Sequence, residues 1–245
     1  MEGVIRNVRT YDHFCLVARA LERVGDRWSL LVIRDLLTGA KRFTDLMDRL
    51  RGITPKTLSQ RLRELEDAGI VAADREAGRR EVWYRLTPAG SDLGPVIEAL
   101  NWWGLRNAWR RPEAGEHLHA EHLLRSAIQA IDLGAGDREP ARWHFRIDGT
   151  DYLAESDGRH WSLTAGAPAA DADVTITGTA ESLTALIFGG SDAGLGITGA
   201  PEPVRRFRQL IGTLATVVAP ARARTGPVLP FLCNTFCVTL SVWQS

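Results

Sequence analysis

Apolar residues recur at helical spacing through the first part of the chain, and short alternating segments follow later, so the period of the pattern changes along the sequence. Four helices are predicted first, and glycines or tight connections end them. A β-hairpin is expected next, because alternation at period two replaces the helical period. The predicted helices span 14–24, 27–37, 43–50 and 54–68, and the predicted strands span 70–75 and 81–86.

The segment Thr54 to Ala68 has the marks of a helix with two different faces. Thr54 can supply the capping oxygen and Pro55 suits the first helical position, while Gly69 marks the end. Leucines at positions 58, 62 and 65 form a narrow apolar stripe. The opposite face and the predicted hairpin, whose tip is basic, carry hydrogen-bond donors of the kind that bind base edges and phosphates. A solvated polar surface is the alternative. The candidate DNA-binding residues are Thr54, Lys56, Thr57, Ser59, Gln60, Arg61, Arg63, Arg75, Arg79 and Arg80.

Thr87-Pro88 begins another predicted helix, which bends near Gly94-Pro95 and runs to about Trp109. It carries two apolar stripes, although one stripe would suffice to cover the core of its own domain. Large aromatic residues dominate many protein interfaces, so the second stripe predicts a homodimer contact made by Trp102, Leu105 and Trp109. Packing of this stripe on the C-terminal half of the chain is the alternative.

The second half predicts a different architecture. Pro112 and Gly115 mark a domain boundary, and a helix is expected over 116–131. Alternating segments near 143–147, 150–155, 159–164 and 173–177, separated by turn signals, predict hairpin-linked antiparallel strands. Residues 176–181 and 197–202 repeat a strand, glycine turn and helix start at an offset of 21. An α+β domain with hairpin-linked antiparallel strands is therefore expected.

Charge divides unequally between the halves, although the net charge of the chain is zero. Residues 1–111 hold 20 Lys and Arg against 15 Asp and Glu, and residues 112–245 hold 10 against 15. The basic half contains the segment that begins at Thr54, which favours nucleic acid as the partner of this half. No secretion signal or membrane-spanning run is recognisable, and three cysteines are too few for a disulfide framework, so a cytoplasmic protein is expected.

No combination of residues predicts catalysis or a cofactor. The sequence lacks a recognisable nucleophile motif and a phosphate-binding loop, so we do not expect an enzyme. His117, His119 and His122 with Glu121 could suggest a metal site, but their spacing has no matching pair elsewhere. The interpretation favoured by the sequence is a solvated helix face and no bound metal.

Residues 13–109 resemble the HxlR-type winged helix-turn-helix regulators, which are related to the MarR group. Five blocks in order carry the resemblance: CLVARAL (15–21), GDRWSLL (25–31), RFTDL (42–46), GITPKTLSQRLREL (52–65) and YRLTPAG (84–90). The resemblance implies a mainly α winged-helix domain, a homodimer and a partly palindromic double-stranded DNA operator. Leu16 departs from the proline of many members. Because some members sense oxidants through a cysteine here, Cys15 becomes a candidate sensor, with a structural thiol as the alternative.

Residues from about 120 to 215 are similar in pattern to sterol-carrier-protein-like domains. This resemblance implies an α+β antiparallel sheet with helices on one side, an apolar cavity and a hydrophobic small-molecule effector. The residues expected to line that cavity, or else to fill the core, are Trp143, Phe145, Trp161, Leu163, Leu186 and Phe207. The expected domains are 1–111 for DNA binding and dimerisation, 112–220 for ligand binding, and a C-terminal tail, 221–245, to which we assign no role.

Together these features predict a one-component transcriptional regulator, expected to act as a repressor. One alternative is a lipid or metabolite carrier whose N-terminal domain only dimerises. Another is a thiol-based sensor that acts through Cys15.

Overall fold

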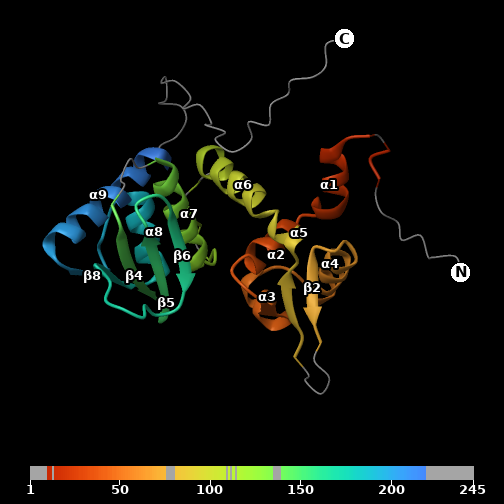
Figure 1. Cartoon of the computed structure of the whole chain (residues 1–245), viewed down its shortest axis with the longest axis horizontal. Coiled ribbons are helices and arrows are strands. Elements are labelled where there is room, and N and C mark those ends of the chain that lie inside the picture. The colour runs from red at the N-terminus through yellow and green to blue at the C-terminus, as the bar shows by residue number, and fades with distance from the viewer. Residues whose placement is uncertain are drawn as a thin grey trace, which may run out of the picture.

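The computed structural model describes residues 10–12, 14–75, 81–108, 110, 112–113, 115–134 and 139–218. Two domains lie side by side, and α6 bridges them (Figure 1). Each domain has its own cluster of buried apolar side chains.

The N-terminal domain combines helices with a small antiparallel sheet of strand order β1-β3-β2. Because β2 and β3 pair from Val71↔Leu86 to Asp74↔Trp83, they form the predicted hairpin, which extends away from the C-terminal sheet in Figure 1. The elements are α1 (Leu16–Val24), α2 (Ser29–Leu36), β1 (Lys41–Arg42), α3 (Phe43–Arg49), α4 (Pro55–Asp67), β2 (Val71–Asp74), β3 (Trp83–Leu86), α5 (Pro88–Ser91) and α6 (Gly94–Asn107).

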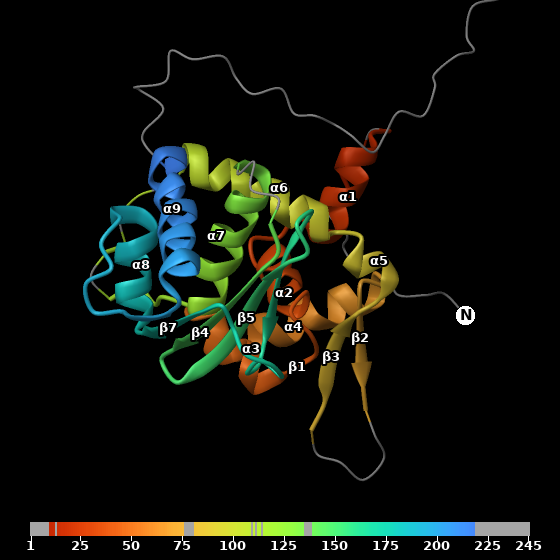
Figure 2. The ribbon, with the colours of Figure 1, turned by 60° about the vertical axis from the view of Figure 1, so that its left-hand side comes forward.

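Helix α1 is not the core helix that its apolar spacing suggests. Leu16, Val17 and Leu21 are exposed, whereas Ala18 and Val24 are buried. Both ribbon views show α1 projecting from the rest of the domain (Figures 1 and 2). Within the described part of the chain, the apolar face of this helix is therefore left exposed.

Helix α6 contacts both cores along its length. Leu93, just before it, and Ile97 pack on the N-terminal core, while Trp102 and Leu105 pack on the C-terminal core. Asn101 adds a polar contact to α7 (Ala120–Gly134): its Nδ2 donates to Gln129 Oε1 at 2.7 Å. The expected bend near Gly94 is a break between α5 and α6.

The C-terminal domain is a five-stranded sheet with α7, α8 and α9 on one face (Figure 2). Its strand order is β6-β5-β4-β7-β8, and the central β4 and β7 run parallel. The prediction of an antiparallel sheet was wrong on this point, because the chain crosses from the edge strand β6 to the far side of β4. The elements are β4 (Ala141–Ile147), β5 (Thr150–Ser156), β6 (Trp161–Ala165), β7 (Val174–Gly178), α8 (Ala180–Gly189), β8 (Gly196–Gly199) and α9 (Pro201–Val218).

Alternation along β4 explains why one sheet face is covered and the other is open. Ala141, Trp143, Phe145 and Ile147 are buried against the helices, whereas the residues between them are polar and less buried. The β4–β5 turn, Asp148-Gly149, has φ values of 50° and 76°, as expected for a tight two-residue hairpin. The repeated strand-turn-helix unit is confirmed, since β7–α8 and β8–α9 follow one another and the two strands pair.

Candidate nucleic-acid interface

Helix α4 is held by features that the sequence predicts. The Thr54 hydroxyl accepts a hydrogen bond from the Thr57 backbone N–H at 3.1 Å, and Pro55 occupies the first turn. Leu58, Leu62 and Leu65 are buried in the N-terminal core. Because one face is fixed in this way, the opposite face of α4 is presented to solvent.

The presented face carries donors of three chemical kinds. Lys56, Gln60 and Arg63 are exposed, and Ser59 lies half-buried beside them. Gln60 Nε2 donates to Glu64 Oε1 at 2.9 Å, which orients the amide while leaving one of its donor hydrogens for a partner. Thr54 and Thr57 are joined to each other through their hydroxyls at 2.8 Å.

Arg61 does not belong to this face, contrary to the sequence-based expectation. Its Nη1 lies 2.6 Å from Glu64 Oε2 and 3.6 Å from Asp26 Oδ2, and the side chain is largely buried. Two carboxylates therefore direct this guanidinium towards the N-terminus of α2. These ion pairs hold Arg61 against the protein, and a contact of Arg61 with DNA stays a prediction.

The hairpin contributes further cations near α4. Arg75 is exposed and makes two bonds, at 2.6 and 2.8 Å, to the Glu66 carboxylate of α4. This pairing raises the pKa of Arg75 and, through the Arg75 hydrogen bonds, lowers the pKa of Glu66. Because both nitrogens are engaged, Arg75 ties the hairpin to α4. Arg79 and Arg80 lie outside the described residues.

Apolar faces of α1 and α6 are exposed beside this domain. Phe14, Leu16 and Val17 on one side, and Leu100 and Trp103 on the other, are exposed large hydrophobic residues. The predicted interface residues Trp102 and Leu105 instead pack on the C-terminal core, which is the alternative stated above. Trp109 lies outside the described residues. The unpaired face of α6 is therefore the one that carries Trp103.

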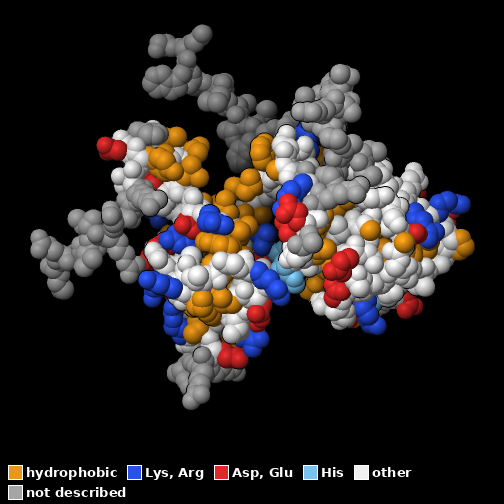
Figure 3. Space-filling view, turned by 180° about the vertical axis from the view of Figure 1, so that it is seen from behind, with side chains coloured by type: hydrophobic (Ala, Val, Ile, Leu, Met, Phe, Trp, Pro, Cys, Tyr) orange, Lys and Arg blue, Asp and Glu red, His pale blue; other side chains and the backbone are white. Residues whose placement is uncertain are grey.

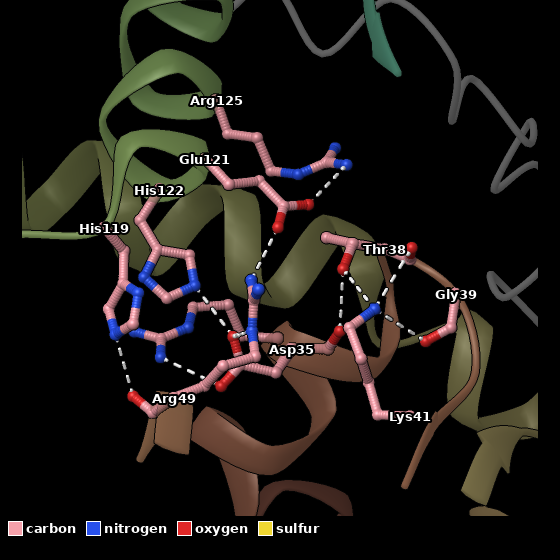
Figure 4. A network of polar contacts seen from close by, with 10 residues as sticks. Asp35, Thr38, Gly39, Lys41, Arg49, His119, Glu121, His122 and Arg125 are labelled. Carbon is pink, nitrogen blue, oxygen red and sulfur yellow. Dashed lines mark hydrogen bonds and ion pairs between the residues drawn. The ribbon is translucent and has the colours of Figure 1, made fainter. Parts of the chain in front are cut away.

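A buried network joins the two domains, and it was not anticipated from the sequence. Arg49, the last residue of α3, donates from Nε to Asp35 Oδ1 at 3.2 Å and from Nη2 to Glu121 Oε2 at 2.6 Å (Figure 4). His122 donates from Nε2 to Asp35 Oδ1 at 2.7 Å. The ring of His119 bonds the Arg49 carbonyl oxygen at 3.0 Å. Helix α7 is thus attached to the end of α3, four residues before Ile53 at the entry to α4.

Ionisation in this network is strongly biased by burial and by its charges. Burial would raise the pKa of Asp35, but the hydrogen bond from His122 and the arginine charges nearby hold that pKa well below its usual value. Burial likewise opposes ionisation of Glu121, yet the bond from Arg49 lowers its pKa. Desolvation lowers the pKa of His122, and it lowers the pKa of His119 to about 4. Both imidazoles are therefore neutral at pH 7, and both carboxylates are charged.

The interpretation of 117–122 as a solvated helix face was accordingly wrong. His119 and His122 are half-buried, and Glu121 is buried. Within the ranges that the structure describes, no group of three or more acidic, histidine or cysteine side chains is arranged to hold a metal ion. One sequence signal could have revealed the junction: Asp35 lies three residues after Val32 on the apolar face of α2, where a lone carboxylate requires a buried partner.

Apolar residues expected at a C-terminal ligand site lie within the packed core or at its edge. Trp143 contacts the rings of Trp161 and Phe207 at centroid distances of 4.3 and 5.0 Å. Phe145, Leu163 and Leu186 are buried in the same cluster as Trp143, so the six residues form one packed group. Trp161 also lines a hollow of about 630 Å³, whose other walls are mostly polar.

Cys15 immediately precedes α1 at its N-cap position and is a half-buried free thiol. Among the helices within the described ranges, none is long and apolar enough to cross a lipid bilayer.

Comparisons with known proteins place the first domain. A sequence model described as HxlR-like helix-turn-helix matches residues 23–112. A helix-turn-helix-type transcriptional regulator of Mycobacterium bovis is 46% identical over 91 residues, which cover 36% of this chain and 56% of the relative. One of Synechocystis is 37% identical over 106 residues, covering 42% of this chain and 76% of the relative. The chain thus spans about half the length of the mycobacterial relative.

A solved structure of a MarR-family transcriptional regulator from Porphyromonas gingivalis also aligns with the chain. It is 27% identical, covers 39% of this chain and 95% of its own, and has a TM-score of 0.38.

Proposed function

We propose that this chain, which belongs to the HxlR-like helix-turn-helix family of transcriptional regulators, binds a specific double-stranded DNA operator through the exposed face of α4. The single observation that carries the proposal is the geometry of α4: leucines bury one face, and Lys56, Gln60 and Arg63 are exposed on the other. Arginine suits guanine, glutamine suits adenine, and lysine suits phosphate.

The hydrogen-bond donors on α4 suit base edges in the major groove better than they suit an anionic surface without base edges. Gln60 and Arg63 lie within one helical turn, so both can reach base edges of neighbouring base pairs. Ser59 and Thr57 can donate to phosphate oxygens at the sides of the groove. The hairpin, tied to α4 by Arg75, would then lie over the adjacent backbone, with Arg79 and Arg80 of its tip at phosphates.

A homodimer would complete the operator complex. The exposed faces of α1 and α6, which carry Leu16, Val17, Leu100 and Trp103, together exceed the scattered apolar residues of a monomer surface. A second copy of the chain supplies the same two faces, so two-fold pairing would cover both. Such pairing presents two α4 helices to two half-sites, which explains why a palindromic operator is expected.

The C-terminal domain is proposed as a sterol-carrier-like effector domain that takes a hydrophobic small molecule. Support comes from helices on one sheet face, the repeated strand-turn-helix unit and an aromatic core that includes Trp143 and Phe207. A ligand that binds the folded domain and not the unfolded chain should raise the melting temperature of the full chain. A series of fatty acids and sterols that leaves the melting temperature unchanged would contradict this assignment.

The test of operator binding is selection from random double-stranded DNA followed by affinity measurements over a salt series. A regulator should recover one sequence family, bind it at least about 10³-fold more tightly than scrambled DNA, and lose affinity as salt rises. A carrier whose N-terminal domain only dimerises would recover no common sequence, and that result would refute the proposal. Alkylation of Cys15 with unchanged operator affinity would exclude a thiol-sensing role for that residue.

A further inference from the structure

An open groove of about 580 Å³ lies between the two domains, a volume suited to a small organic molecule. Its walls come from the start of α2, the α3–α4 turn, the segment after α6 and the segment before α7. Figure 3 shows histidine and basic side chains together in the hollow between the two lobes. The groove is therefore built by both domains, and neither domain would form it alone.

Cationic groups dominate the polar part of the groove. Arg34, Arg49, Arg51 and Arg110 line it, and Glu116 is the acidic residue in the lining. Arg49 is neutralised by the buried network, and Arg110 pairs with Glu116. Arg34 contacts Asp35 through Nη2, while its buried Nε has no hydrogen-bond acceptor among the described residues. The Arg34 side chain is 30% exposed, so part of this charged group remains at the wall although its Nε is buried.

Arg51 is the most available of these cations. It lies in the turn between α3 and α4, is exposed, and has no ion pair or side-chain hydrogen bond within the described part of the chain. His119 and His122 also line the groove, but their lowered pKa values, caused mainly by desolvation, keep them neutral near pH 7. They can contribute polar contacts without adding charge.

Apolar side chains form the remainder of the wall. Trp28 and Leu31 come from the N-terminal domain, and Leu118 comes from the segment before α7. The Trp28 ring also lies next to Gly52 in the α3–α4 turn. The Trp28 Cη2 atom would be 4.0 Å from a Cβ atom added to Gly52. An aromatic surface beside the exposed Arg51 guanidinium and the partly exposed Arg34 suits a molecule that is anionic at one end and apolar at the other.

We propose that this groove binds a small amphipathic carboxylate, with its carboxylate at Arg34 and Arg51 and its apolar body against Trp28 and Leu118. Such a ligand would contact the turn that leads into α4 and the segment that leads into α7 at the same time. Its binding would therefore fix the position of the C-terminal domain relative to α4. This coupling to DNA rests on the proposed function, whereas the binding itself does not.

The test uses isothermal titration calorimetry on the full chain without DNA, with 1-naphthoate as the probe. The neutral 1-naphthamide has the same apolar body and no charge, so it should bind at least about tenfold more weakly. Arg51→Glu should weaken naphthoate binding by at least about tenfold, because it replaces attraction by repulsion. Arg159→Glu is the matched control: this exposed arginine lies in the β5–β6 turn, outside the groove lining, and its replacement should leave the affinity unchanged.

Equal affinities for naphthoate and naphthamide would overturn the proposal. Equal naphthoate affinities of the Arg51→Glu and Arg159→Glu variants, or no heat of binding at millimolar probe, would also overturn it.

A second measurement follows operator affinity with and without naphthoate. A change for the wild type that is lost in Arg51→Glu supports the coupling. Binding of naphthoate with no effect on DNA would contradict the coupling while leaving the site intact, and absence of any specific operator would refute the proposed function instead.

Discussion

Replacement of Arg49 by alanine should be among the most costly single changes at the domain junction, because this cation is shared by two buried carboxylates. Its nitrogens lie 3.2 Å from Asp35 and 2.6 Å from Glu121. The Asp35 and Glu121 side chains are 0% and 7% exposed, so water replaces little of the lost interaction. Removing one partner of a buried pair typically costs about 3–5 kcal/mol. His122 and Arg34 still face Asp35, so we expect the lower end, about 3 kcal/mol.

The assay is urea unfolding at pH 7, in which a change of midpoint at constant slope reports the change in free energy of unfolding. Arg125→Ala is the matched control, since Arg125 faces the same Glu121 carboxylate at 3.4 Å but is 38% exposed. Its loss should cost less than about 1 kcal/mol. The double change Arg49→Ala with Glu121→Ala should cost less than the sum of the single changes. Equal losses for Arg49→Ala and Arg125→Ala would refute the argument that this network stabilises the junction.

Two further predictions concern pH and assembly. The melting temperature should fall as the pH is lowered from 6.5 towards 4, because the depressed pKa values of His119 and His122 make protonation favour the unfolded chain. His119→Gln should reduce the slope of melting temperature against pH. A melting temperature that stays constant over that range would contradict this prediction. Trp103→Glu should convert a dimer to a monomer in sedimentation experiments with little loss of stability, since Trp103 is 58% exposed. Trp102→Ala, in contrast, should destabilise the C-terminal core, on which Trp102 packs. A dimeric Trp103→Glu variant would place the interface elsewhere.

Local sequence signals predicted the elements well because they act within a few residues. The Thr54 cap, the leucine stripe of α4 and the Asp148-Gly149 turn all lie where the sequence placed them. Helical periodicity also identified the apolar faces of α1 and α6, but it cannot say what covers a face. The stripe that carries Trp102 therefore follows the intrachain alternative and packs on the C-terminal core, while Trp103 is exposed.

Contacts between distant segments were the features that sequence reasoning missed. Asp35 and His122 are 87 positions apart and bond at 2.7 Å, and nothing near either residue specifies the other. The parallel pairing of β4 and β7 has the same origin, since alternation indicates strands but not their partners. The burial of Arg61 was also missed, because its contact with Glu64 lies within α4 but its contact with Asp26 comes from the connection before α2.

The most direct test of DNA reading by α4 compares Gln60→Ala and Arg63→Ala with the wild type on selected DNA and on scrambled DNA over a salt series. Both variants should lose about 1–3 kcal/mol on the selected sequence and much less on the scrambled one, with relaxed preference at particular base pairs. Arg79→Ala, in the sequence between the two hairpin strands, should weaken binding to both DNAs alike and lower the salt slope by about 1. Equal losses on both DNAs for Gln60→Ala and Arg63→Ala would show that α4 does not read the operator.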